Sequence, residues 1–305
     1  MDLLHLTLRQ LRTFVAVARG GTTMAASATL AMSQSATSAS LNELERSLAL
    51  RLFDRAGRRL ALNDNGRALL PRALALLDGA ADIERLARAG GALQELRIGA
   101  STTIGNYLLP TLLARYLNGG QRPDGPWRST VSIGNTEAIS AALAAFELDV
   151  GLIEGRCTQP SLVARPWRRD RLRVVAAPSI AAAALARHGR RVPIGALREF
   201  VWLLREPGSG TRQATDELLL PHLRSYRRSI ELASSEAIKR AVAEGLGIAC
   251  LSHSVVADWI DLGRLRQLPT TLPLLTRQCY LVMHRDKLPS AALSRFLELA
   301  QDAHA

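Results

Sequence analysis

The sequence predicts an α/β protein that carries a small all-α domain in its N-terminal part, with one long helix between the two. Three observations predict this arrangement: short helical patterns rich in small residues over 1–62, a thin apolar stripe over 63–90, and alternating strand and helix patterns over 91–305. A chain of 305 residues is long enough for about two domains, each with its own core.

The first domain begins with three short helical patterns. The run Thr7–Gln10 has the spacing of a capping box, and the helix that it starts should end at Gly20-Gly21. A second helix is expected over about 22–30. Ser33 is placed to cap a third helix over about 34–48.

The turn between the second and third helices has almost no large apolar residue near it. Two helices joined by a tight turn cross closely only where the contact residues are small, and Ala25, Ala26 and Ala36 fit that role. The short polar side chains that begin the third helix can reach base edges and phosphates in the major groove of DNA. An ordinary helical hairpin with a solvated serine face has the same spacing, and spacing alone gives the two interpretations equal weight.

A β-hairpin and a long helix follow. The run Arg51–Asp64 predicts a short hairpin with Gly57 in its turn. Asn63 caps the long helix, Pro71 should kink or loosen it, and Gly90-Gly91 should end it as a hinge. Its apolar stripe is spaced like a coiled coil, so it can pair with a second copy or pack on the chain's own second domain. The stripe consists of Leu69, Ala73, Leu76, Ala80 and Ile83.

The second domain, expected over 91–305, alternates strand and helix, which is typical of a parallel sheet with helical crossovers. The series resembles a periplasmic-binding-protein fold of two lobes. We expect the first lobe at about 94–164 and 270–305, and the second lobe at about 165–269. A ligand should lie between the lobes, where strands end and helices begin.

Three polar stretches fall at such positions: one after the first strand of the domain, one after a strand of the second lobe, and one before a later helix. Hydroxyls and free backbone N–H groups there can hold an anion, and Arg205 can add a charged fork. Taken singly, each stretch is explained better as an ordinary helix cap; three together favour a small anionic effector. Glu154 would oppose an anion unless it is paired or protonated. The predicted effector site consists of Ser101, Thr102, Thr103, Asn135, Thr136, Glu154, Arg205, Ser209, Gly210, Thr211 and Ser235.

The net charge of +12 fits an acidic polymer as a partner, but its distribution weakens that inference. Residues 1–62 hold eight Arg and four acids, whereas 165–228 hold fourteen Arg and five acids. Because thirty-seven of the thirty-nine basic residues are Arg, a GC-rich genome explains the excess equally simply.

Enzyme signatures are not found. Gly208-Ser209-Gly210 has neither the spacing of a nucleophile elbow nor the lysine of a phosphate loop, and the six histidines are scattered. We therefore expect no catalytic residues, no cofactor and no metal. The three cysteines lie far apart, which predicts buried thiols in a reducing cytoplasm, and no apolar run is long enough to span a membrane.

The run Leu8–Leu70 resembles the N-terminal domain of LysR-type transcriptional regulators. The match includes Ser33-Gln34, Leu44-Glu45 and Leu52–Arg55, and the resemblance extends over nearly the whole chain. It implies a winged helix-turn-helix whose third helix reads the major groove, a linker helix, and an effector-binding domain. The residues assigned to DNA binding are Thr23, Ser33, Gln34, Ser35, Thr37, Ser38, Ser40, Arg55, Arg58 and Arg59.

The chain departs from the family pattern at Ser35, where proline is usual, at Ala39, where arginine often stands, and at Asn63, where threonine usually caps the linker. Ala39 lacks the groups that contact phosphate or guanine, so direct readout should be weaker or shifted to its neighbours.

The resemblance also implies dimers that pair into tetramers on promoter DNA, with RNA polymerase as a further partner and a sulfur oxyanion or a small carboxylate as effector. The competing classes are an α/β enzyme, which would need a catalytic constellation, and a plain ligand-binding protein, which would not need residues 1–62.

Overall fold

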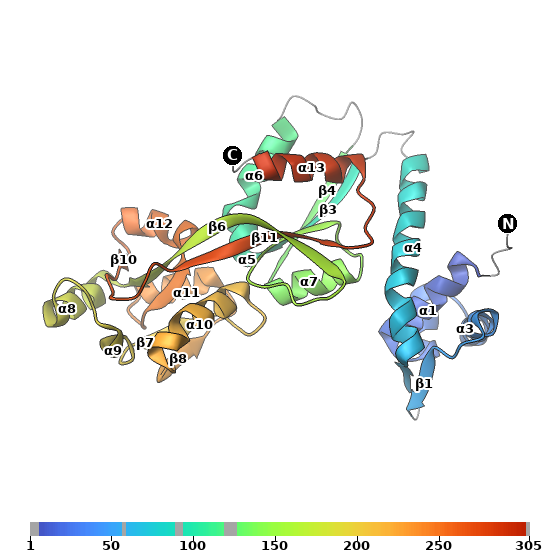
Figure 1. Ribbon diagram of the computed structural model, residues 1–305, viewed down its shortest axis with the longest axis horizontal. Coiled ribbons are helices and arrows are strands. Elements are labelled where there is room, and N and C mark those ends of the chain that lie inside the picture. Colours follow the sequence, from blue (N-terminus) through green and yellow to red (C-terminus); the bar gives the residue numbers. More distant parts are fainter. Residues whose placement is uncertain (1–5, 57–58, 89–93, 119–126, 303–305) are drawn as a thin grey trace. The chain divides into compact units, whose positions relative to one another are not determined.

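The computed structural model describes residues 6–56, 59–88, 94–118 and 127–302 (Figure 1). The chain forms two compact units, Met1–Leu93 with Asp286–Leu288, and Gln94–Arg285 with Pro289–Ala305. The long helix that we predicted as a separate linker therefore clusters with the N-terminal unit. In the described parts of the chain, no helix is long and apolar enough to cross a membrane.

The N-terminal unit begins with the predicted capping box: Gln10 N–H donates to Thr7 Oγ1 (3.2 Å) and Thr7 N–H donates to Gln10 Oε1 (2.8 Å). Gly21 ends the first helix with a left-handed φ of 67°. The elements of this unit are α1 (Leu8–Gly20), α2 (Thr23–Leu30), α3 (Gln34–Leu48), β1 (Phe53–Ala56), β2 (Arg59–Leu62) and α4 (Asp64–Arg88).

The core of this unit is built around Phe14 and Leu44, which are both fully buried, and Phe14 packs its ring 5.6 Å from that of Phe53. Of the three small residues predicted to line the helix crossing, Ala26 is fully buried in this core, Ala36 is half-buried and Ala25 is exposed. A Cβ added to Gly20 would lie 2.9 Å from the Cβ of Ala25, so α1 and α2 approach closely at that point.

The long helix α4 is capped as predicted, because Gly66 N–H donates to Asn63 Oδ1 (3.0 Å). Gly66 also permits a close approach to the wing: an added Cβ would lie 2.2 Å from the carbonyl oxygen of Leu52. The helix continues through Pro71 to Arg88. The predicted turn at Gly57 and the predicted hinge at Gly90-Gly91 lie outside the described residues.

The second unit contains one continuous mixed sheet in the order β10-β6-β11-β5-β3-β4, with β9 also paired to β6, and a separate parallel pair of β7 and β8. Its elements are β3 (Gln94–Ser101), α5 (Thr102–Tyr107), α6 (Leu109–Asn118), β4 (Trp127–Gly134), α7 (Thr136–Ala144), β5 (Val150–Glu154), β6 (Leu162–Ala176), α8 (Pro178–His188), α9 (Ile194–Leu197), β7 (Val201–Leu204), α10 (Gly210–Leu223), β8 (Arg228–Glu231), α11 (Ser235–Ala243), β9 (Ala249–Ser252), α12 (His253–Asp261), β10 (Arg266–Gln267), β11 (Thr276–His284) and α13 (Ala291–Asp302).

The long strands β6 and β11 run antiparallel through the middle of this unit (Figure 1). The expected parallel pairing holds for β3 with β4 and with β5, but the strands that join the two halves are antiparallel. Each half has its own cores: α6 and α13 cover one face of the first half and α7 the other. Trp167 of β6 still packs on the first half, so the chain crosses to the second half near Asp170, later than the predicted residue 165.

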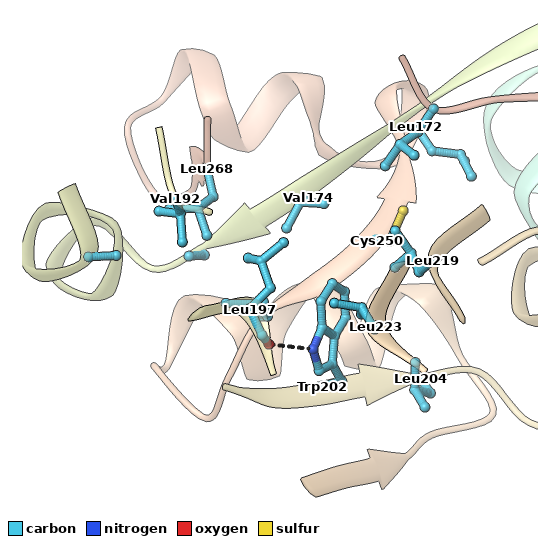
Figure 2. Close-up of a cluster of buried hydrophobic side chains, with 14 of the residues drawn as sticks. Leu172, Val174, Val192, Leu197, Trp202, Leu204, Leu219, Leu223, Cys250 and Leu268 are labelled. Carbon is cyan, nitrogen blue, oxygen red and sulfur yellow. Dashed lines mark hydrogen bonds between the residues drawn. The ribbon is translucent and has the colours of Figure 1, made fainter. Parts of the chain in front are cut away.

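The core of the second half is centred on Trp202, which is fully buried (Figure 2). Its indole N–H donates to the carbonyl oxygen of Leu197 (3.0 Å), so the one polar atom of the ring is satisfied. This packing fixes β7, and β7 ends one residue before Arg205. The core thus sets the position of a predicted site residue.

Candidate functional site

The start of α3 presents polar side chains to solvent. Ser33, Gln34 and Ser35 are exposed, and Ser38 is half-buried one turn further on. Ser33 caps the helix, since its Oγ accepts a hydrogen bond from Ala36 N–H (3.2 Å), and it shares a second bond with Ser35 Oγ (3.0 Å). These are the groups that a helix entering the major groove would bring to DNA.

Two predicted DNA contacts, Thr37 and Ser40, make hydrogen bonds within the N-terminal unit, and only Thr37 is fully buried. The prediction for Thr37 is wrong: its side chain is fully buried and its hydroxyl donates to Ser33 O (3.0 Å). Ser40 is half-buried, and its hydroxyl donates to Thr13 Oγ1 (3.2 Å), which ties α3 to α1. Thr23, the first residue of α2, is half-buried, and its role stays a prediction.

Asn42 was missed by the sequence reasoning. It is exposed on α3, seven residues after Ser35, and therefore on the same face two turns later. An asparagine on that face can bond both edge atoms of an adenine. Its spacing from Ser35 places it on this face, although it lies outside the first turn of α3, where most of the predicted contacts on this helix fall.

The hairpin of β1 and β2 presents Arg55 and Arg59 to solvent, while Arg58 lies outside the described residues. A buried acid anchors this hairpin: Glu45 accepts a hydrogen bond from Leu52 N–H (2.7 Å) and an ion pair from Arg51 (3.0 Å). The hairpin is therefore held to the end of α3, and Arg55 and Arg59 are exposed on it.

The predicted pairing stripe on α4 divides into two parts. For Ala73 the prediction is wrong, because its side chain is fully buried in the core of its own unit. Leu69 is partly buried against the same core, and its role in pairing stays a prediction. Leu76 and Ile83 are 56% and 71% exposed, and Ala80 lines an open groove of about 650 Å³ between α1 and α4. An apolar face that remains uncovered in the single chain is suited to a second copy.

In the second unit, Arg205 joins the two lobes. Its guanidinium is only 3% exposed. Nη1 donates to Ser235 Oγ of the second lobe (3.0 Å), and Nη2 donates to Thr102 Oγ1 of the first lobe (3.4 Å). Nε and Nη2 also bond both carboxylate oxygens of Glu206, at 2.7 and 2.9 Å. Three of the predicted residues thus meet at one guanidinium.

A second junction forms where α7 and α10 begin. Thr136 Oγ1 donates to Glu154 O (2.8 Å), and Asn135 caps α7 by accepting from Ala138 N–H (2.9 Å). Gly210 lies against the same carbonyl group: an added Cβ would be 1.9 Å from Glu154 O. Only glycine permits the first turn of α10 to reach the end of β5 at that distance.

A buried arginine that the sequence did not single out completes this junction. Arg277 of β11 lies 2.8 Å from Asp170 and 3.5 Å from Glu154, and its Nη1 donates to Thr211 Oγ1 (2.8 Å). Burial alone would lower the pKa of Arg277, but the charges of Glu154 and Asp170 raise it above its ordinary value. Glu154 is therefore paired, as an anion site beside it requires.

The first stretch supplies unsatisfied hydroxyls. Ser101 and Thr103 are almost fully buried, and within the part of the chain that the structure describes neither hydroxyl has a hydrogen-bond partner. Buried polar groups are normally bonded, so these two are available to a ligand. Ser209 caps α10 by accepting from Arg212 N–H (3.4 Å).

An open groove of about 410 Å³ lies between α7 and α10, and among the predicted residues Thr136 and Ser209 line it. The lobes touch along its edge, where Glu137 N–H donates to Gly208 O (3.1 Å). The remaining predicted residues for which contacts are given lie in the buried lobe interface. The groove is lined by polar residues from both lobes, and its acidic and basic side chains balance. It is therefore suited to binding a small ligand.

Cys250 and Cys279 are buried, and burial raises the pKa of each thiol to about 12, so both stay protonated at neutral pH. Across residues 6–56, 59–88, 94–118 and 127–302, no group of three or more His, Cys, Asp or Glu side chains is placed to hold a metal ion.

Two family models match the chain. Residues 8–67 match the bacterial regulatory helix-turn-helix protein of the lysR family, and residues 89–305 match the LysR substrate binding domain. An uncharacterized HTH-type transcriptional regulator of Escherichia coli K12, YeiE, is 45% identical over 302 residues, which is 99% of each chain.

Solved structures agree on the fold. Full-length OxyR of Pseudomonas aeruginosa aligns with a TM-score of 0.68 at 23% identity, over 99% of this chain and 95% of that one. The regulatory domain of CcmR from Synechocystis, in complex with 2-PG, aligns with a TM-score of 0.59 at 27% identity, over 68% of this chain and 96% of that one.

Proposed function

Since the chain belongs to the LysR family of bacterial transcriptional regulators, we propose that it reads an operator through α3 and the β1–β2 hairpin, and that a small anion bound between its two lobes controls it. It is a DNA-binding regulator with an effector-binding domain and not an enzyme. The observation that carries the effector proposal is the meeting of Thr102, Arg205 and Ser235 at one buried guanidinium.

The DNA-binding part of the proposal rests on exposed polar groups along one helix face. Gln34, Ser35 and Asn42 are exposed on α3, Ser33 is exposed at its N-cap, and Arg55 and Arg59 are exposed on the wing. Phosphate contacts from the wing would position the helix, and base contacts from α3 would specify the sequence. A gel shift with the DNA upstream of the gene tests this: binding should be sequence-specific and should weaken steeply as salt rises. Salt-insensitive binding, or none, contradicts it.

A dimer of dimers is the assembly that we propose. A single recognition helix offers few base contacts, whereas two helices one DNA turn apart fit a pseudo-palindromic site. The uncovered face of α4 with Leu76 and Ile83 is the surface proposed for pairing. Ile83→Asp should dissociate the assembly in sedimentation experiments, whereas Leu262→Asp, equally exposed but just after the end of α12, should leave its mass unchanged.

The effector is proposed to be a small oxyanion, such as a sulfur oxyanion or a small carboxylate. Arg205 supplies the charge, and the buried hydroxyls of Ser101 and Thr103 lack partners among the described residues. The CcmR domain, whose fold is similar, was solved with 2-PG. Binding would shift the balance between lobe arrangements, change the geometry of the assembly and alter the bend of the DNA.

Isothermal titration of the full-length protein with sulfite, sulfate, phosphate and small carboxylates tests the effector proposal. At least one of these anions should give saturable heat, and Arg205→Ala should abolish that heat. If no anion of this panel gives heat with the wild-type protein, the anion proposal fails.

A further inference from the structure

Glu206 occupies the part of Arg205 that is best shaped for an anion. Its Oε2 lies 2.7 Å from Nε and its Oε1 lies 2.9 Å from Nη2. These two parallel N–H groups are the fork with which a guanidinium binds a carboxylate or another oxyanion in a bidentate way. In this structure, the fork of the predicted anion-binding residue is therefore already filled by a carboxylate of the same chain.

The same carboxylate also takes part in the contact between the lobes. Asn135 Nδ2, at the start of α7 in the first lobe, donates to Glu206 Oε1 (3.3 Å). On the other side, Arg205 reaches Thr102 of the first lobe and Ser235 of the second. Glu206 thus bridges the lobes in the way expected of a bound effector.

Glu206 is ionised in this position. Burial alone would raise its pKa, but hydrogen bonds from Arg205 and from its own backbone, together with the charge of Arg205, lower the pKa below its ordinary value. The pair is consequently neutral overall. If Glu206 stayed in place, an incoming anion would meet a guanidinium whose positive charge is already balanced by the Glu206 carboxylate.

Arg205 and Glu206 differ in how far they are exposed to solvent. Arg205 is 3% exposed and is also held by Thr102 and Ser235, whereas the side chain of Glu206 is 19% exposed. Of the two partners, the glutamate therefore lies closer to solvent and the arginine is the more deeply buried.

We propose that Glu206 is a tethered internal ligand: it fills the Arg205 fork when no effector is bound, and an anionic effector binds by displacing it. This inference rests on the proposed function of the cleft and adds its regulation. Because the competing carboxylate is attached to the chain, it acts at a high effective concentration and weakens the apparent affinity for any free anion. Its departure also breaks the Asn135–Glu206 bond, which couples binding to a change at the lobe interface.

The test is Glu206→Gln in the full-length protein, measured by isothermal titration with sulfite, sulfate, phosphate and malonate. The amide keeps the size of the side chain and removes the charge that competes. If the fork is filled more than nine-tenths of the time in the free protein, the variant should bind the responding anion at least about tenfold more tightly. Glu206→Asp, whose shorter side chain reaches the fork poorly, should also tighten binding, and it keeps the test valid if the amide variant unfolds.

The matched control is Glu231→Gln. Glu231 ends β8, is half exposed and also pairs with an arginine, Arg212, at 3.3 Å. Its replacement removes the same charge from the same lobe, so affinity should change by less than about twofold.

Unchanged or weaker binding by both Glu206 variants overturns the inference and makes Glu206 a residue that positions Arg205; in that case the wild-type protein still binds an anion and the proposed function stands. If no anion of the panel binds the wild type or either variant, the anion-effector proposal and this inference both fail.

Discussion

In the DNA-binding face, the side chains proposed to act come from one run of the chain, residues 23–59, and most of those described are exposed. In the effector cleft they come from segments as distant as Thr102, Arg205 and Arg277, and most are buried and already bonded to one another. The first surface meets a large partner whose own groups complete it. The effector cleft must pair its buried charges within the chain and exchange those bonds for bonds to a ligand. We therefore expect a substitution in the cleft to lower the stability of the unit as well as its affinity for a ligand.

We expect the largest loss of stability from replacing Arg277, in the effector cleft. Replacing Arg277 by Ala would leave Glu154 and Asp170 buried without their cation, which should lower the free energy of unfolding by ~3–5 kcal/mol. All four tryptophans lie in the α/β unit, so their fluorescence during urea unfolding reports on that unit alone. Arg266→Ala, an exposed position on β10, should stay within ~0.5 kcal/mol of wild type. Equal losses in the two variants would show that the buried cluster has no special weight.

Gly210→Ala should act next most strongly, because the new Cβ would fall 1.9 Å from the Glu154 carbonyl oxygen, and backbone atoms there cannot give way cheaply. We expect a loss of ~1–3 kcal/mol in thermal unfolding and weaker anion binding, since α10 must move away from β5. Gly195→Ala is the matched control, because nothing lies within 4 Å of its added Cβ. If the Gly210→Ala variant bound the anion as tightly as the wild type, the close contact between α10 and β5 would not be needed for anion binding.

The two regions also differ in how far sequence could predict them. At the front, caps and spacing are local: Thr7, Ser33 and Asn63 were placed from the letters near them, and the structure has them as caps. Where burial decided the role, local pattern failed. Thr37 carries the same hydroxyl as an exposed neighbour, yet it faces the core.

In the cleft, sequence found the residues that end strands or begin helices but not what they bind. Arg277 was overlooked because an arginine in a strand is usually exposed, and its partners Asp170 and Thr211 are far away in the chain. Glu206 is next to Arg205 in the sequence, but only the distances from its carboxylate oxygens to Nε and Nη2 of Arg205, 2.7 and 2.9 Å, show that it fills the fork. Such pairings depend on tertiary placement, which no periodicity encodes.

Gln34 and Thr37 lie three residues apart on α3, one exposed and the other fully buried. Gln34→Ala removes an exposed group at the helix tip and should cost ~1–3 kcal/mol of discrimination against a wrong base, with unfolding unchanged. Thr37→Val keeps the buried shape and loses the bond to Ser33 O, so it should cost ~1 kcal/mol of stability and leave operator affinity intact. Competition gel shifts and thermal melts of both variants separate the two roles. If the Thr37→Val protein were stable but did not bind the operator, Thr37 would have to be a DNA contact after all.

The smallest expected effect concerns charge. Residues 165–228 carry more excess positive charge than residues 1–62, so net charge points to a different region from the one that we assign to DNA binding. Arg59→Gln should reduce the slope of log affinity against log salt by ~1 and weaken binding about equally for all DNA sequences, as expected for one lost phosphate contact. Arg224→Gln, exposed on the second lobe, should leave that slope unchanged. Equal reductions from the two substitutions would mean that DNA also contacts the α/β unit, and the division of labour between the two regions would have to be redrawn.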